Sequence, residues 1–164
     1  MAHDEAGILK SRSYLTGLVE AEMKDQKIPS DRIIIGGFSQ GGAVSLFTGL
    51  TIKLKLAGIY GLSCYLALHD KVPEYMKEAN KVNQDTPVFI GHGDADQVVR
   101  YEWGAETARM IEKDLGHKVQ FETYPNLPHS AALEEIDDLE KWITKCLDAK
   151  PAATGESSES KASM

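Results

Sequence analysis

The sequence predicts an α/β fold in which helices flank a mainly parallel β-sheet. Short apolar segments of strand length alternate along the chain with longer segments whose apolar residues recur at helical spacing. The first of the short segments, Arg32–Phe38, is an almost unbroken apolar run rich in isoleucine, which is typical of a strand buried on both faces. Strands that alternate with helices of this length form right-handed βαβ units on a parallel sheet.

In the N-terminal half, each element is indicated by its own pattern. Glu5–Gln26 is predicted to be a helix, because its apolar residues recur at helical spacing with charges between them. A turn at Ile28–Arg32 leads into the strand Arg32–Phe38. Gln40–Thr51 is predicted to be the next helix, and the apolar segment Leu54–Leu62 the second strand.

The C-terminal half continues the alternation after an irregular segment. The predicted elements are that irregular segment at Ser63–Thr86 with a short helix at Glu74–Val82, a strand at Pro87–Gly93, a helix at Tyr101–Leu115, a strand at Lys118–Pro125 and a helix at Leu133–Leu147. Gly116 follows the fourth helix, and glycine is a common helix stop. The last helix carries its apolar residues on a single stripe, as expected for a helix that packs on a sheet.

The length and composition fit one folded domain followed by a short tail. The 164 residues are 42% hydrophobic and 26% charged, which is ordinary for a globular protein that buries a sizeable core. We expect one domain over residues 1–149. Residues 150–164 are small, polar and almost free of aliphatic side chains, so we expect this tail to be disordered.

Charge and cysteine use exclude several classes of protein. The net charge of −7 argues against a nucleic-acid partner, which needs a basic surface against phosphate. The two cysteines, Cys64 and Cys146, form no CxxC motif and suit free thiols in a reducing compartment. No apolar run has the length of a secretory signal at the N-terminus or of a membrane span elsewhere. We therefore expect a cytoplasmic protein without an integral membrane segment.

The segment Gly37–Gly41 matches the pattern G-x-S-x-G, with Ser39 at its centre. The motif lies between a predicted strand and a predicted helix, which is the context that a nucleophilic serine requires. The glycines permit a strained turn in which bulky neighbours would clash, and the turn exposes the serine hydroxyl above the sheet edge. The alternative is a glycine-rich turn that binds a phosphate or only packs tightly. The strand and helix on either side favour the nucleophile.

A nucleophilic serine needs a base and an acid, and both are expected on loops at the carboxyl ends of later strands. The third strand ends in GHGDADQVV, which offers Asp94 and Asp96. The fourth strand is followed by NLPHS, which offers His129 as the base, whereas His92 lies within a strand end and is expected to be structural. Asp94 could instead cap the turn after Gly93. Asp96 is further out and can reach an imidazole, so it is preferred as the acid.

Four segments, taken in order, resemble the acyl-protein thioesterase, lysophospholipase and carboxylesterase family of α/β-hydrolases. They are GGFSQGGAVSL, LAGIYGLSCYL, PVFIGHGDADQVV and YPNLPHS. The resemblance covers about Asp4 to Leu147 and is closest to the eukaryotic cytosolic acyl-protein thioesterases. It implies an α/β-hydrolase fold with a mainly parallel sheet flanked by helices.

The resemblance also implies a role for particular residues. Ser39 matches the nucleophile, His129 the base and Asp96 the third member of the triad, and the backbone N–H of Gln40 matches one oxyanion donor. A segment that lines the acyl-binding channel in the family matches Ser63, Cys64, Tyr65 and Leu66. These side chains could equally belong to the core.

The activity implied is that of a serine hydrolase that removes long-chain acyl groups, such as palmitoyl, from cysteine thioesters of proteins. Lysophospholipase or carboxylesterase activity is implied besides. The substrates would be S-acylated proteins, such as lipidated G proteins, and lysophospholipids. The resemblance implies a location in the cytoplasm or nucleus, with transient contact with a membrane surface. No metal or organic cofactor is implied, because His, Cys and acidic residues do not cluster at ligand spacing.

One family motif is not found in this sequence. Members carry upstream strands and a motif resembling H-G-L-G-D, which supplies the second oxyanion donor, whereas this sequence begins close to the helix before the nucleophile strand. The chain is therefore expected to match the C-terminal two-thirds of a member. Loss of one oxyanion donor costs about 3–4 kcal/mol of transition-state stabilisation. The alternative function is accordingly a catalytically weak or silent form of such an enzyme.

Overall fold

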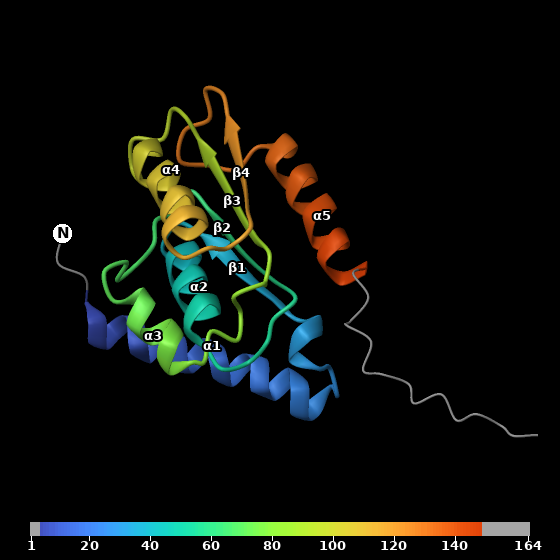
Figure 1. Ribbon diagram of the computed structural model, residues 1–164. Coiled ribbons are helices and arrows are strands. Elements are labelled where there is room, and N and C mark those ends of the chain that lie inside the picture. The colour runs from blue at the N-terminus through green and yellow to red at the C-terminus, as the bar shows by residue number, and fades with distance from the viewer. Residues whose placement is uncertain (1–3, 149–164) are drawn as a thin grey trace, which may run out of the picture.

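The computed structural model describes residues 4–148, which form a four-stranded sheet with helices on both faces (Figure 1). The predicted disordered tail, 150–164, lies outside the described residues. In chain order the elements are α1 (Glu5–Asp25), η1 (Ser30–Arg32), β1 (Ile34–Phe38), α2 (Gln40–Thr51), β2 (Gly58–Leu62), α3 (Val72–Glu78), β3 (Val88–Gly93), α4 (Tyr101–Arg109), η2 (Met110–Asp114), β4 (Val119–Tyr124) and α5 (Leu133–Asp148).

The sheet is parallel throughout, with the strand order β1-β2-β3-β4. Each crossover therefore moves the chain one strand further in the same direction. Phe38 pairs with Leu62 at the carboxyl end of β1, and Gly93 pairs with Tyr124 at the carboxyl end of β3. The predicted α/β fold with a parallel sheet is confirmed, and the carboxyl ends of all four strands lie along one edge.

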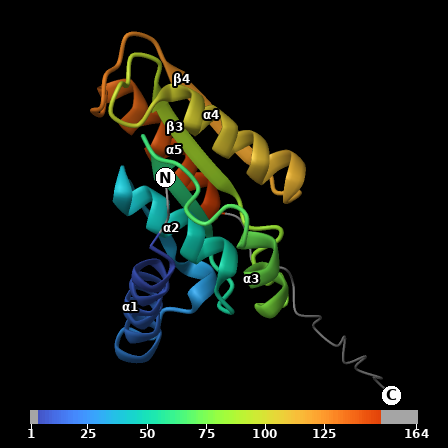
Figure 2. The same ribbon diagram turned by 90° about the vertical axis from the view of Figure 1, so that its left-hand side faces the viewer.

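The helices divide between the two faces of the sheet. Helices α2, α3 and α4 lie on one face, where α1 packs against α2, and α5 lies on the other (Figures 1 and 2). The side chains of β3 alternate between these layers. Val88 and Ile90 join the larger core on the α2 side, whereas Phe89 packs against Trp142 of α5 with ring centroids 5.7 Å apart. This two-sided burial explains why the strand reads as a continuous apolar run.

Strand β1 lies at the edge of the sheet within residues 4–148, where it pairs with β2 alone. The isoleucine run predicts a strand buried on both faces, but only Ile35 of β1 is fully buried, and Phe38 is 39% exposed. The difference follows from pairing, because a strand with one neighbour leaves its other edge uncovered.

Helix α3 begins two residues earlier and ends four residues earlier than the predicted helix Glu74–Val82. Pro73 accounts for the earlier start, because proline is favoured in the first turn of a helix. Asn80 and Lys81 account for the earlier end, since both have positive φ angles that a helix cannot continue.

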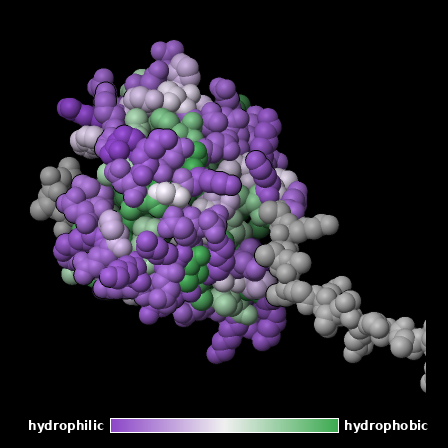
Figure 3. Space-filling view, viewed as in Figure 1, coloured by the Kyte–Doolittle hydropathy of each residue, from purple (hydrophilic) through white to green (hydrophobic). Residues whose placement is uncertain are grey.

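The surface in Figure 3 is mainly hydrophilic, with hydrophobic residues visible between the hydrophilic ones. The larger exposed apolar residues include Tyr14 and Leu18 of α1, Val98 in the loop after β3, and Leu133 of α5. Among residues 4–148, no helix combines the length and apolar character needed to cross a bilayer.

Candidate active site

Ser39 stands between β1 and α2 in a strained backbone conformation. Its φ of 56° and ψ of −124° lie in a region that non-glycine residues rarely occupy. The turn is held by the strand beside it, since the Ser39 N–H donates to the carbonyl of Leu62 at 2.8 Å. Strain of this kind persists only where the surrounding structure enforces it, and it is common at functional sites.

The glycines around Ser39 allow β1 and α2 to approach each other closely. A Cβ on Gly37 would lie 2.6 Å from the backbone carbon of Gly41, and a Cβ on Gly42 would lie 2.8 Å from the carbonyl oxygen of Gly37. A Cβ on Gly41, by contrast, would meet no heavy atom within 4 Å. The motif predicts a steric need for glycine at Gly37 and Gly41, on the two sides of Ser39. In the structure the need arises at Gly37 and at Gly42.

The loops after β3 and β4 are joined by backbone hydrogen bonds, which brings the acid and base segments together. The N–H of Asp94 donates to the carbonyl of Tyr124, and the N–H of Ala95 donates to that of Leu127, both at 3.1 Å. The exposed carboxylate of Asp94 accepts from the N–H of Asn126 at 2.6 Å. The carboxylate of Asp94 therefore binds the backbone of the loop after β4, 32 residues further along the chain, whereas the alternative role offered by the sequence was a cap of the turn after Gly93.

Asp96 and His129 lie in a continuous chain of hydrogen bonds with Ser39. The Asp96 side chain is fully buried, and its Oδ1 accepts from the N–H groups of Val98 and Val99 at 2.9 and 3.0 Å. Its Oδ2 lies 2.8 Å from His129 Nδ1, and His129 Nε2 lies 3.1 Å from Ser39 Oγ. The structure thus brings together the three residues that the sequence selected from three different loops.

This chain of contacts defines the protonation of His129. A carboxylate oxygen accepts hydrogen bonds, so Nδ1 of His129 carries the hydrogen and donates a hydrogen bond to Asp96. Nε2 is then free to accept the hydroxyl proton of Ser39. Phe38 packs on the imidazole at a centroid distance of 4.8 Å and supports its orientation. The arrangement can activate a serine for attack on a carbonyl.

Gln40 is the first residue of α2, directly after Ser39. The first N–H groups of a helix have no partner within the helix and carry the positive end of its dipole. This placement fits the N–H of Gln40 as a donor to an oxyanion formed at Ser39. The role stays a prediction.

The segment Ser63–Leu66 follows the end of β2 and is largely buried. Cys64 and Leu66 belong to the core on the α2 side, Ser63 is also buried, and the partly buried Tyr65 packs against that core. Burial of the Cys64 thiol raises its pKa to about 12. Within residues 4–148 these contacts support packing against the turn around Ser39, since a Cβ on Gly42 would lie 2.9 Å from Cys64 Sγ, and an acyl-binding role stays a prediction.

Two buried polar groups, His92 beside Asp96 and Glu135 beside β3, lie outside the set selected from the sequence. His92 lies 3.5 Å from Asp96 Oδ2 through its Nε2. Glu135 of α5 is fully buried against β3, where a Cβ on Gly91 would lie 2.6 Å from its Oε2. Spacing along the chain indicates neither contact, although the position of His92 at the end of a predicted strand was a usable signal.

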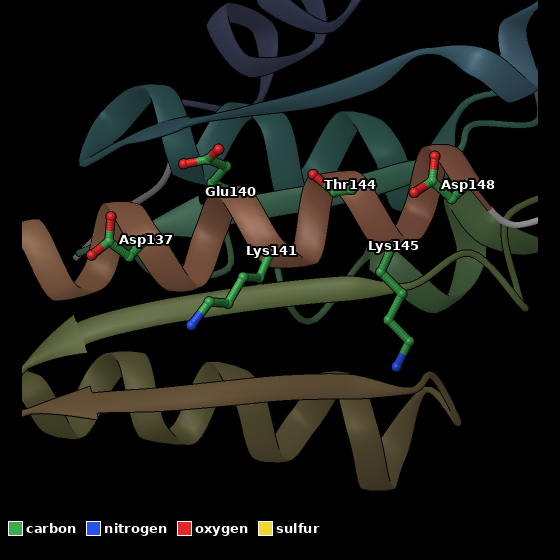
Figure 4. A pocket seen from close by; sticks show the side chains of 6 residues that line it. All are labelled: Asp137, Glu140, Lys141, Thr144, Lys145 and Asp148. Carbon is green, nitrogen blue, oxygen red and sulfur yellow. The ribbon is translucent and has the colours of Figure 1, made fainter.

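A solvent-open hollow of about 470 Å³ runs along α5 (Figure 4). Its lining residues are Asp137, Glu140, Lys141, Thr144, Lys145 and Asp148. Their charges are mixed and none of them belongs to the triad, so this hollow is not part of the candidate site. Over the described part of the chain, no three His, Cys, Asp or Glu residues converge in a way that could hold a metal ion.

Curated proteins of known name are similar to this chain in sequence. The chain is 51% identical over 144 residues to acyl-protein thioesterase 1 of Neurospora crassa, and 49% identical over 148 residues to acyl-protein thioesterase 1 of Emericella nidulans. These matches cover 88% and 90% of this chain but 58% and 61% of the relatives. The chain therefore spans about three-fifths of the length of these curated relatives.

Solved structures of similar proteins share the fold of this chain. The crystal structure of Zea mays acyl-protein thioesterase 2 matches with a TM-score of 0.79 and 26% identity, over 89% of this chain and 67% of that one. The crystal structure of Arabidopsis thaliana SOBER1 matches with a TM-score of 0.79 and 27% identity, over the same shares of the two chains. A family model described as phospholipase/carboxylesterase matches residues 1–147. The chain therefore belongs to the phospholipase/carboxylesterase family of α/β-hydrolases.

Proposed function

We propose that the protein is a serine hydrolase that cleaves acyl thioesters and esters through Ser39, His129 and Asp96. The observation that carries this proposal is the chain of two hydrogen bonds, 2.8 Å from Asp96 to His129 and 3.1 Å from His129 to Ser39. The strained turn that presents Ser39 at the start of α2 supports it further.

The reaction proceeds by acyl transfer through a covalent intermediate. His129 takes the hydroxyl proton of Ser39 as Oγ attacks the carbonyl carbon of the substrate, and the carboxylate of Asp96 stabilises the imidazolium. The N–H of Gln40 donates to the oxyanion that develops on the carbonyl oxygen. His129 then returns the proton to the leaving thiol or alcohol. Water, activated by the same imidazole, hydrolyses the acyl-serine and restores the free enzyme.

The substrate class proposed is S-acylated protein, with long acyl chains such as palmitoyl. The names of the fungal relatives, acyl-protein thioesterase 1, support this class at 51% and 49% identity. Lipidated G proteins and lysophospholipids are further candidates within the same chemistry, and the cytoplasm is the proposed location.

The test is labelling of the purified chain with a fluorophosphonate probe, together with hydrolysis of a palmitoylated peptide thioester. We expect labelling and thioester hydrolysis in the wild type and neither in Ser39→Ala. Ser45→Ala is the matched control, because Ser45 lies on α2 and is buried away from the triad contacts. Folded wild-type protein that neither labels nor hydrolyses would instead support the catalytically silent alternative.

A further inference from the structure

His92 lies at the junction of the sheet, α4 and the loop that carries Asp96. It is the penultimate residue of β3, and its side chain is fully buried. Its Nε2 lies 2.8 Å from the carbonyl oxygen of Val99 and 3.5 Å from Oδ2 of Asp96. Since a carbonyl oxygen can only accept, Nε2 carries a hydrogen and donates a hydrogen bond to the Val99 carbonyl.

The other side of the His92 ring is held by α4. A Cβ on Gly104 would lie 2.1 Å from His92 Nδ1, so the absence of a side chain there is what admits the ring. Tyr101 meets the imidazole edge to face, with ring centroids 5.9 Å apart. The imidazole is therefore confined between the helix and the loop, and Nε2 can point only toward the loop.

Val99 connects His92 to the acid. Its carbonyl accepts from His92, while its N–H donates to Oδ1 of Asp96 at 3.0 Å. The remaining carboxylate oxygen, Oδ2, is the one bound to His129 and lies between the two imidazole rings, 2.8 Å from one and 3.5 Å from the other. His92 is therefore connected to both oxygens of the Asp96 carboxylate, to Oδ1 through Val99 and to Oδ2 by direct proximity.

We propose that His92 is a positioning residue for the hydrolytic reaction, because its hydrogen bond to Val99 holds the loop that directs Asp96 at His129. This inference rests on the proposed function. A histidine that only filled space could be replaced by an apolar side chain of similar size without loss of turnover. A positioning histidine needs its N–H donor, and its effect passes through Asp96.

The decisive variants are His92→Leu, which removes the donor, and His92→Gln, whose amide N–H can occupy the position of Nε2. Misplacement of a catalytic group by 1 Å costs about 100-fold, so we expect His92→Leu to lower kcat by about that factor with KM little changed. His92→Gln should recover most of the loss. In an Asp96→Asn background, His92→Leu should cost little more, because residues that act as a unit are non-additive. Equal losses in His92→Leu and His92→Gln, or an additive loss in the double variant, would overturn the proposal.

A measurement independent of turnover separates this inference from the proposed function. The Nδ1 proton of His129, which is hydrogen-bonded to Asp96, should give a strongly deshielded proton NMR resonance in the wild type and in His92→Gln. It should shift or vanish in His92→Leu. A wild type that hydrolyses no ester refutes the proposed function, whereas an unchanged resonance in His92→Leu refutes the role of His92.

Gly104→Ala covers the case in which His92→Leu does not fold. The added methyl displaces the imidazole without removing a polar group, and we expect the same loss of kcat and the same change in the His129 resonance. Wild-type kcat and resonance in folded Gly104→Ala would contradict the proposal.

Discussion

Glu135 is a fully buried carboxyl whose ionisation opposes folding. Neither of its oxygens has a hydrogen-bond partner among the described residues. Burial, and after it the nearby charge of Asp138, raises the pKa of Glu135 from 4.5 to about 7. The folded state therefore holds this proton at pH values where the unfolded chain has released it. Its contribution to stability is complete below about pH 4.5 and is lost as the pH rises through about 7.

The substitution Glu135→Gln keeps the shape of the side chain and removes its ionisation. Each pKa unit corresponds to about 1.4 kcal/mol, so ionisation of Glu135 costs the folded state roughly 3 kcal/mol. We expect Glu135→Gln to match the wild type near pH 4.5 and to exceed its free energy of unfolding by about 3 kcal/mol at pH 8. The measurement is urea unfolding at both pH values, monitored through the fluorescence of the buried Trp142.

Glu134→Gln is the matched control, because Glu134 lies on the same turn of α5 and is exposed. Its replacement should change the free energy of unfolding by less than about 0.5 kcal/mol at either pH. A difference between the wild type and Glu135→Gln that is the same at pH 4.5 and pH 8 would refute the reasoning, because it would show that Glu135 holds no extra proton in the folded state.

Three further predictions concern the acid of the triad, the glycines around Ser39 and the thiol of Cys64. Asp96→Asn should lower kcat about 10⁴-fold in steady-state hydrolysis, whereas Asp94→Asn should lower it far less. A larger loss of kcat in Asp94→Asn would reassign the acid. Gly37→Ala should destabilise the fold by about 1–3 kcal/mol in thermal unfolding, because the added methyl meets backbone atoms. Gly41→Ala, whose methyl meets no atom, should not destabilise it, and equal melting points of the two variants would contradict this. The buried thiol of Cys64, with its raised pKa, should resist iodoacetamide at pH 8 until the protein unfolds, and rapid native alkylation would show that it is accessible.

The order of the elements and the identity of the triad candidates could be predicted from the sequence. Both depend on local patterns. The apolar run before Ser39 and the helical spacing after it indicate a strand and a helix without reference to the rest of the chain, and parallel strands bring their carboxyl ends to one edge. That rule, together with the chain order of serine, acid and histidine and with the family resemblance, predicts His129 and the acid loop near Ser39. Strand ends were less predictable, since β2 begins at Gly58 and not at Leu54.

The sequence prefers Asp96 to Asp94 as the acid, but only the tertiary structure gives each carboxylate its partner. Both follow Gly93 on one loop, and a side chain's partner depends on which second loop lies beside it. The contact with the loop after β4 turns Asp94 outward to the N–H of Asn126 and Asp96 inward to His129.

The same reason explains why Glu135 and His92 were not selected from the sequence. Their surroundings are built by residues distant in the chain, with Gly91 beneath the carboxyl of Glu135 and Gly104 beside the ring of His92. The sequence by itself determined which elements form and which residues could react. Packing between those elements decided which carboxylate meets the histidine and which polar groups are buried, because burial and hydrogen bonding depend on contacts that no local pattern encodes.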